Sequence, residues 1–352
     1  MNIEFIEALK QIGQEKGITT DILLEAIEAA LISAYKKNYG TSQNVRVYID
    51  RETGEVKVFT QKNVVEDVEN ELLEISVVDA IKHNPNYQVG DIVEFEVTPK
   101  KFGRIAAQTA KQVVVQRIRE AERDVIYEEY SGRESDIVTG LIQRVDRNTV
   151  YIDLGKIEAI LLPGEQTGNE GYTQGKRIKT YILEVRNTTK GPQIYVSRTH
   201  PGLVKRLFEL EVPEIHDGVV EIKAIARESG FRTKIAVNSR DENVDPVGSC
   251  VGPKGVRVQT IVEELNGEKV DIIKWSANYD EYIANSLSPA KVISVNVNEA
   301  EKIASVVVDD QQLSLAIGKE GQNVRLAAKL TGWKIDIKSA SQHDIINEGG
   351  PI

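Results

Sequence analysis

Two short glycine-bounded segments carry the residues best suited to chemistry in this sequence. Gly252-Pro253-Lys254-Gly255 returns downstream as Gly318-Lys319-Glu320-Gly321, so each copy places two residues, one of them lysine, between two glycines. Glycine has no Cβ, and the helix after such a turn presents free backbone N–H groups, so a phosphate backbone can approach closely. The chemistry that this pattern favours is therefore non-covalent binding of a nucleic-acid backbone.

The residues around each segment repeat as well. An apolar helix end precedes the glycines, and a second helix follows with apolar residues at three- and four-residue spacing over 258–265 and 324–330. Asn266-Gly267 and Thr331-Gly332 end these helices before alternating strands at 269–272 and 334–337. A lone Gly-x-x-Gly favours an ordinary helix-turn-helix, but repetition of the whole context favours the RNA-backbone clamp of a KH domain.

Length and composition restrict the class of protein. The 352 residues are enough for two or more domains, and the single cysteine, Cys250, rules out a disulfide framework within the chain. No apolar run reaches membrane-spanning length, and the N-terminus lacks the order of a signal peptide. We therefore expect a soluble cytoplasmic protein with no membrane partner.

The charge is unevenly distributed along the chain. The net charge is −10 overall and −7 over residues 1–130, yet residues 176–206 hold eight basic residues against Glu184 alone, a net +7. Such a stripe attracts phosphates even on an acidic protein, and Lys176, Arg177 and Arg198 are our candidate RNA contacts from it. A solvated basic face with no ligand is the equal alternative.

The order of expected elements predicts a multidomain α+β fold. Residues 1–130 read as an N-terminal α+β domain of two helices and a hairpin, with a long connecting helix from about Arg104 to Tyr130. Residues 134–200 read as five short strands, the pattern of an OB-type barrel. Residues 201–276 and 277–344 each read as helix, two strands, two helices and strand, the type II KH order, before a tail at 345–352.

The predicted barrel resembles the S1 RNA-binding domain. Gly140 and the Val150–Gly155 stretch carry this likeness, and Tyr151 stands where that family places a stacking aromatic residue. Leu162-Pro163 occupies the place of a polar or aromatic contact, so we expect stacking on this face to be weak and sequence-tolerant. Tyr151 is as well explained as a half-buried strand residue.

As a whole, the chain resembles the NusA family of bacterial transcription elongation factors. The likeness rests on three sets of residues: Gly191-Pro192-Gln193 with Ser197-Arg198-Thr199-His200-Pro201, the segment Asp245–Gly252, and Gln312–Gly318 with Gly321–Leu326. It implies that residues 1–130 bind RNA polymerase core near the RNA exit channel, through residues that the sequence does not single out. It also implies that the S1 and KH domains hold single-stranded nascent RNA, so that the protein modulates pausing, termination and antitermination.

The resemblance also assigns roles within the glycine segments. Gly252, Gly255, Gly318 and Gly321 would admit the RNA backbone, with Lys254 and Lys319 near phosphate and Arg257 and Arg325 as further backbone contacts. Asn323 would either reach a base edge or cap its helix. Glu320 repels phosphate and Pro253 lacks an N–H donor, so we expect the two sites to differ. The family implies a monomer without cofactors and leaves room for other antitermination factors as partners.

Catalysis is not expected from these residues. The four histidines, His83, His200, His216 and His343, share no metal-ligand spacing, no P-loop is present, and Cys250 reads as a buried thiol. Two other hypotheses remain open: an S1–KH subunit that recruits RNA to a degradation complex, and an enzyme housed in residues 1–130. Co-purification with polymerase core or with an exonuclease ring would separate the first from the transcription hypothesis.

Overall fold

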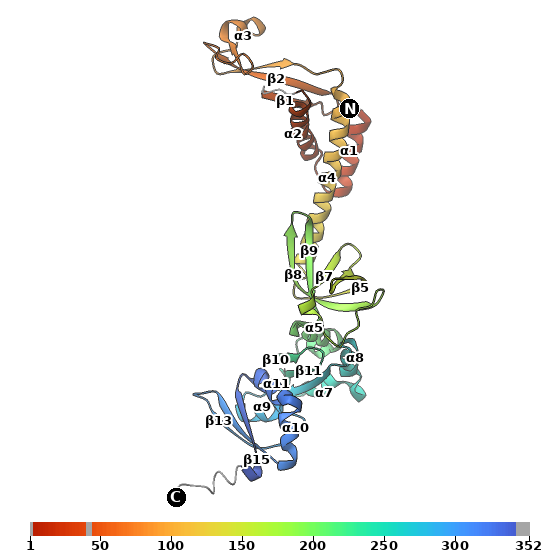
Figure 1. The fold of residues 1–352 in the computed structure, drawn as a ribbon, viewed down its shortest axis with the longest axis vertical. Helices are drawn as coiled ribbons and strands as arrows, with labels where there is room; N and C mark the ends of the chain where they lie inside the picture. The colour runs from red at the N-terminus through yellow and green to blue at the C-terminus, as the bar shows by residue number, and fades with distance from the viewer. Residues whose placement is uncertain (1–2, 40–43, 343–352) are drawn as a thin grey trace. The chain divides into compact units, whose positions relative to one another are not determined.

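The structure, a computed structural model, describes residues 3–39 and 44–342. His343 and the expected tail at 345–352 lie outside the described residues. The chain divides into two compact units, Met1–Ile126 and Tyr127–Ile352, and each is described by itself. Figure 1 labels many of the elements within both units.

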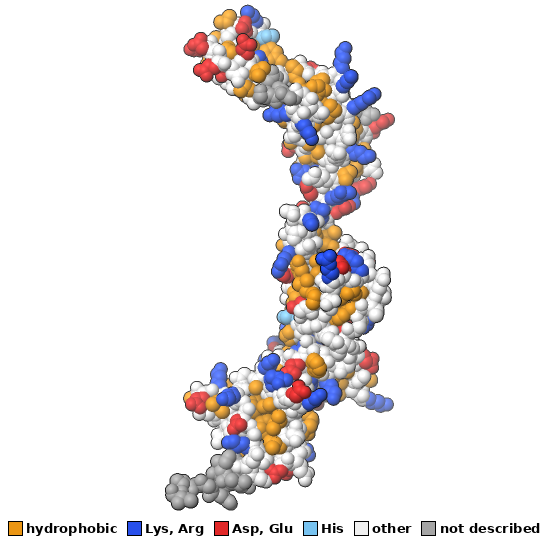
Figure 2. Space-filling view, in the orientation of Figure 1, with side chains coloured by type: hydrophobic (Ala, Val, Ile, Leu, Met, Phe, Trp, Pro, Cys, Tyr) orange, Lys and Arg blue, Asp and Glu red, His pale blue; other side chains and the backbone are white. Residues whose placement is uncertain are grey.

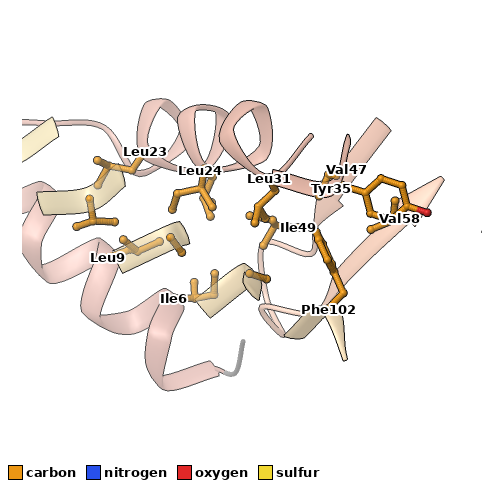
Figure 3. Packing of buried hydrophobic residues seen from close by; sticks show 14 of the residues in the cluster. Ile6, Leu9, Leu23, Leu24, Leu31, Tyr35, Val47, Ile49, Val58 and Phe102 are labelled. Carbon is orange, nitrogen blue, oxygen red and sulfur yellow. The ribbon is translucent and has the colours of Figure 1, made fainter. Parts of the chain in front are cut away.

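The first unit has a core formed by helices and a hairpin. Its helices are α1 (Ile3–Lys16), α2 (Thr20–Tyr39) and the first part of α4 (Phe102–Ser131), and its hairpin pairs β1 (Asn44–Ile49) with β2 (Val56–Val65). Apolar side chains from α1, α2 and the strands point toward one another, and Phe102 at the start of α4, which is 1% exposed, belongs to the same cluster (Figure 3). The two helices, the hairpin and the long helix expected from the sequence are confirmed.

A smaller group of elements extends this sheet. β3 (Glu74–Ser76) pairs parallel with β2, β4 (Ile92–Glu96) pairs antiparallel with it, and the short helix α3 (Val77–His83) follows β3 directly. Val64, Ala80 and Val93 form a small core between them. β3 and α3 are too short to show a clear period in the sequence.

The five short strands close into the expected barrel. Its strands pair in the order β5-β6-β7-β9-β8, where β5 is Ile137–Asp146, β6 Thr149–Asp153, β7 Glu158–Leu161, β8 Arg177–Thr188 and β9 Gly191–Ser197. Gly140 lies where β5 passes close to β6, because a Cβ there would be 2.5 Å from Ile152 Cγ2. The last turn of α4 packs on this barrel in the second unit, since Tyr130 is buried and Glu129 pairs with Lys156 at 2.7 Å.

Two repeated helix-and-sheet folds follow the barrel. We call residues 201–276 the first repeat and residues 277–344 the second repeat. The first contains α5 (Pro201–Glu211), α6 (Pro213–His216), β10 (Val220–Glu228), β11 (Arg232–Ser239), α7 (Pro246–Val251), α8 (Val256–Glu264) and β12 (Lys269–Lys274). The second contains α9 (Tyr279–Ser286), β13 (Val292–Asn298), β14 (Ile303–Val308), α10 (Leu313–Ile317), α11 (Gln322–Thr331) and β15 (Lys334–Ser339).

Both repeats have the same sheet topology. The first two strands pair antiparallel, and the third lies parallel to the middle strand in each sheet. The predicted order of helix, two strands, two helices and strand is therefore confirmed twice.

Continuous apolar cores join the barrel and the repeats. Ile137 and Tyr181 of the barrel lie in one cluster with α5 and the sheet of the first repeat. Ala226, Ala236 and Ile273 of the first repeat pack with Tyr282, Leu326 and Leu330 of the second, where α11 lies against β10. The barrel and both repeats are thus packed as one body.

Candidate nucleic-acid interface

The two glycine loops have the same backbone conformation. Gly252 has φ 72° and ψ 173° and Gly318 has φ 77° and ψ 170°, while Gly255 and Gly321 are both left-handed with φ 77° and 73°. The amide of the second glycine donates to the carbonyl oxygen of the first in both loops, at 3.0 and 3.1 Å. Two different sequences therefore form one turn, each between two helices.

The two glycines of each loop are needed for different reasons. A Cβ on Gly252 would lie 2.6 Å from Arg257 Cγ, and one on Gly318 would lie 2.8 Å from Asn323 Cβ, so the first glycine lies under the next helix. A Cβ on Gly255 would meet nothing within 4 Å. The second glycine is therefore required by its positive φ, and its outer side is open to a ligand.

The middle of each loop holds a strained residue. Lys254 and Glu320 both have φ 54°, a left-handed conformation that costs a residue with a side chain about 1–2 kcal/mol. Lys254 and Lys319 are exposed, and no ion pair is recorded for either within the described residues. Both side chains are thus accessible to solvent.

Arg257 and Asn323, not Arg257 and Arg325, are the equivalent residues of the repeats. Each lies five positions after the first glycine of its loop and covers that glycine. Arg257 Nη1 donates to Ser249 O at 2.7 Å and pairs with Glu214 at 2.9 Å, with its side chain 27% exposed. These contacts tie α8 to α6 and α7, so the guanidinium that we expected on RNA is largely committed to the fold.

Asn323 performs neither role that the sequence left open. Its side chain is 3% exposed, and Nδ2 donates to Leu287 O and Ala316 O, both at 3.0 Å. It therefore joins the ends of α9 and α10 to α11 instead of reaching a base edge or capping α11.

Arg325 connects the two repeats. Its Nε donates to Glu228 Oε1 at 2.6 Å, its Nη1 donates to Glu320 O at 3.1 Å, and its side chain is 47% exposed. The hydrogen bond from Arg325 is the main cause that lowers the pKa of Glu228. Arg325 thus braces the second loop, with part of its surface open to solvent.

Arg198 is not the exposed RNA contact that the basic stripe suggested. It is 2% exposed and binds Glu170, which is equally buried, through Nε and Nη2. Nη1 donates to Lys179 O at 2.7 Å and Nη2 to Glu264 O at 2.7 Å. Burial lowers the pKa of Arg198, but Glu170 outweighs this effect and holds it above the ordinary value. The expectation for Arg198 is corrected: it joins the barrel to α8.

Most of the remaining basic stripe is neutralised locally. Lys179 pairs with Glu264, Arg186 with Glu184, and Arg206 with Glu209. Lys176 and Arg177 are exposed, and no ion pair is recorded for them among the residues that the structure describes. On the face shown in Figure 2, basic and acidic side chains are interspersed. Of the stripe's three candidates, Lys176 and Arg177 remain available.

Tyr151 lies in an outward row that crosses the barrel. Cross-strand partners run from Arg144 through Tyr151 and Ile160 to Tyr195, and paired residues share one face of a sheet. Arg144 lies 3.8 Å from the centre of the Tyr151 ring, and Arg186 lies 4.9 Å from that of Tyr195. Tyr195 is an aromatic candidate that sequence reasoning missed, although it alternates with buried Ile194 and Val196.

The remaining chemistry-bearing groups bear on metal binding, thiol chemistry and membrane insertion. Within residues 3–39 and 44–342, no cluster of three His, Cys, Asp or Glu side chains could hold a metal ion. Burial raises the pKa of the Cys250 thiol to about 12. None of the helices in the same ranges is long and apolar enough to cross a membrane.

Comparison with known proteins agrees with this layout. Family models match for the NusA N-terminal domain over residues 4–124 and the S1 RNA binding domain over 133–197. Models for the NusA-like first and second KH domains match over 198–275 and 279–345.

Curated relatives match over nearly the whole chain. Transcription termination/antitermination protein NusA of Halalkalibacterium halodurans is 63% identical over 342 residues, which covers 97% of this chain and 90% of that protein. The Bacillus subtilis protein of the same name is 63% identical over 96% of this chain and 91% of its own length. The Thermus thermophilus protein of the same name is 45% identical over 98% of this chain and 92% of its own length. This chain belongs to the NusA family of transcription termination/antitermination proteins.

Proposed function

We propose that this protein binds single-stranded nascent RNA through its barrel and both glycine loops while residues 1–130 bind RNA polymerase core. In this way it modulates pausing, termination and antitermination. The observation that carries the RNA part is the repeated loop, in which one strained turn with an open glycine side and an exposed lysine occurs twice. Strained backbone of this kind clusters at ligand sites.

The two loops bind phosphate by different means. In the first, Pro253 lacks an N–H group, so attraction comes mainly from Lys254. In the second, Lys319 is the first residue of a short helical turn, so its backbone N–H has no acceptor within that turn and can donate to a phosphate. The negative charge of Glu320 offsets the positive charge of Lys319. We expect the first loop to depend more strongly on salt than the second.

The barrel supplies stacking surfaces for bases. Tyr151 and Tyr195 face outward, and each is covered by an arginine that a base can displace or stack against. Exposed Lys176 and Arg177 add positive charge at the start of β8. Stacking of this kind accepts any base, so the barrel would hold RNA with little sequence preference.

The proposed polymerase contact includes the tip formed by β3, α3 and β4. Val78, Ile81, Val89 and Ile92 are between 44% and 66% exposed there, which is unusual for apolar residues on neighbouring elements. Acidic side chains lie among hydrophobic ones at this tip (Figure 2). An apolar, acid-rimmed surface fits a protein partner better than it fits RNA. The relatives are transcription termination/antitermination proteins, which supports polymerase as the partner over a degradation complex.

The loop mechanism is tested by a matched pair of substitutions at Gly255. Asp and Asn are similar in size and both tolerate a left-handed backbone, so Gly255→Asp and Gly255→Asn differ mainly by one negative charge. Gly255 is preferable to Gly252, where any side chain would collide with Arg257. We expect Gly255→Asp to weaken binding of single-stranded RNA in a gel shift by about tenfold or more relative to Gly255→Asn.

The same gel shifts, repeated with polymerase core present, separate the two halves of the proposal. Polymerase association should be equal for both variants, because the changed residue lies outside residues 1–130. Equal RNA affinity of the Asp and Asn variants would remove the loop mechanism.

A further inference from the structure

A pocket of about 400 Å³ lies at the junction of the two repeats. The first repeat contributes Phe231, Arg232 and Lys269, and the second contributes residues of its glycine loop together with Pro289, Ser314 and Leu315. This volume is within the range of sites that bind small ligands. Gly318 and Lys319 belong to both the loop and the pocket lining, so the second loop and the pocket form one continuous surface for a ligand.

Phe231 gives this pocket an aromatic wall. Its side chain is 71% exposed, the largest exposed fraction among the large hydrophobic residues in the part of the chain described. The backbone is nevertheless fixed, since its amide donates to Glu228 O at 3.0 Å and its carbonyl accepts from Lys269 N at 3.1 Å. An aromatic ring on a rigid turn, exposed beside a pocket, is suited to stacking on a flat ligand.

The charge of the lining is positive. Arg232, Lys269 and Lys319 line the pocket, and no acidic side chain is among its lining residues. Arg232 is held in place by Asp271, whose carboxylate accepts hydrogen bonds from Nε at 2.7 Å and Nη2 at 2.9 Å. Asp271 also accepts a hydrogen bond from Lys234 Nζ at 3.0 Å, so two cations share the negative charge of Asp271, which does not line the pocket. Two lysines and a fixed guanidinium therefore surround a site with an aromatic wall.

The pocket is separate from the first glycine loop. That loop lies at the start of α8, and Lys269 of the pocket follows the end of α8. The nine residues of this helix span about 13 Å, which separates the loop from Lys269. An extended RNA strand would cross this distance in a few nucleotides. The pocket thus lies beside the second loop and away from the first.

We propose that this pocket holds one nucleotide of the bound RNA, with its base stacked on Phe231 and its phosphate near Lys269 and Lys319. The combination of a flat aromatic surface and positive charge fits a nucleotide, which has both a base and a phosphate. The proposal rests on the RNA-binding function proposed above and adds a base-stacking site between the two repeats. Stacking accepts any base, so this site would add affinity without strong sequence preference.

The test uses the full chain and a single-stranded RNA long enough to contact both loops. Phe231→Ala should weaken binding roughly tenfold, whereas Phe231→Tyr, which keeps the ring, should bind like the unchanged protein. Leu210→Ala is the matched control, because Leu210 is 64% exposed on α5 and does not line the pocket. A photoreactive 5-iodouridine moved along the RNA should crosslink to Phe231 from one or two adjacent positions only.

The outcomes separate this proposal from the proposed function. If Gly255→Asp weakens binding but Phe231→Ala does not, and no position crosslinks to Phe231, the nucleotide pocket is wrong and the loop mechanism stands. If neither substitution changes RNA affinity, the RNA-binding mechanism itself fails. A loss with Phe231→Ala that Leu210→Ala reproduces would also overturn the pocket, because the effect would then belong to any exposed apolar residue.

Discussion

The guanidinium of Arg198 donates hydrogen bonds to residues of three separate segments. Glu170 comes from a barrel loop, Lys179 from β8, and Glu264 from the end of α8. Burial of a charge is unfavourable unless it is paired and hydrogen-bonded, and here both conditions are met. Arg198 therefore fixes the barrel against the first repeat and is inaccessible to RNA.

Replacing Arg198 should reduce stability far more than it reduces RNA affinity. Arg198→Met fills a similar volume but leaves Glu170 buried without its cation, so we expect the free energy of unfolding to fall by about 3 kcal/mol. Urea denaturation measures this loss, and gel shifts on the folded variant measure affinity. Lys176→Met, at an exposed candidate RNA contact, is the converse comparison: it should leave stability unchanged and reduce RNA affinity. Unchanged stability together with a large loss of affinity would show that Arg198 contacts RNA directly.

Residue types alone could not separate the available basic residues from the committed ones. Lys254 and Arg198 are both basic residues in stretches that resemble RNA-binding motifs, yet only Lys254 is exposed. The carboxylates that pair with Arg198, Glu170 and Glu264, lie 28 and 66 positions away in sequence, and no local sequence pattern links them to it. Tyr195 was within reach of sequence reasoning, because strand alternation alone places it outward.

At the scale of elements, long and regular patterns were predictable. Both amphipathic helices of the first unit, the long α4 and every barrel strand follow from hydrophobic period and from glycine or asparagine turns. α3 was missed because its seven residues hold too few apolar positions to define a period, although Ser76 caps it. The equivalence of Arg257 and Asn323 was also missed, since the two residues share a place in the fold and not a residue type.

The last turn of α4 is expected to stabilise the barrel. Tyr130 is 4% exposed and Glu129 pairs with Lys156, so a fragment of residues 127–352 keeps these contacts and a fragment of 134–352 loses them. Burial of one large side chain contributes about 2 kcal/mol. We expect the free energy of unfolding of the shorter fragment, measured by urea denaturation, to be lower by about 2 kcal/mol. Tyr130→Ala in the full chain should show a similar loss. Equal stability of the two fragments would contradict this role.

At the scale of the whole molecule, a net charge of −10 is compatible with RNA binding because only some of the basic side chains are held in ion pairs, as in Lys179 and Arg198, and others are exposed without one among the described residues. Lys254, Lys269 and Lys319 are exposed and lie at the loops and the pocket. A chain with such isolated cations binds phosphate locally without attracting RNA over its entire surface.

The salt dependence of binding should report these few contacts. On a single strand each phosphate contact contributes about 0.7 to the slope of log affinity against log salt, so Lys254, Lys269 and Lys319 together contribute a slope of about −2. Lys254→Gln should therefore make the slope shallower by about 0.7, whereas Lys82→Gln in the first unit, where Lys82 pairs with Asp79, should leave it unchanged. Filter binding over a series of salt concentrations measures both slopes. A flat response of the unchanged protein would exclude binding through phosphates.

The shared cores that join barrel and repeats have one more consequence. If this packing holds the parts in place, the spacing between successive contact points is set by the protein, which would act as a ruler along the transcript. Two binding segments joined by a nucleotide linker of the right length should gain avidity, and a linker one or two nucleotides too short should lose it abruptly. The molecule would then sense the distance between segments of an RNA as well as their composition.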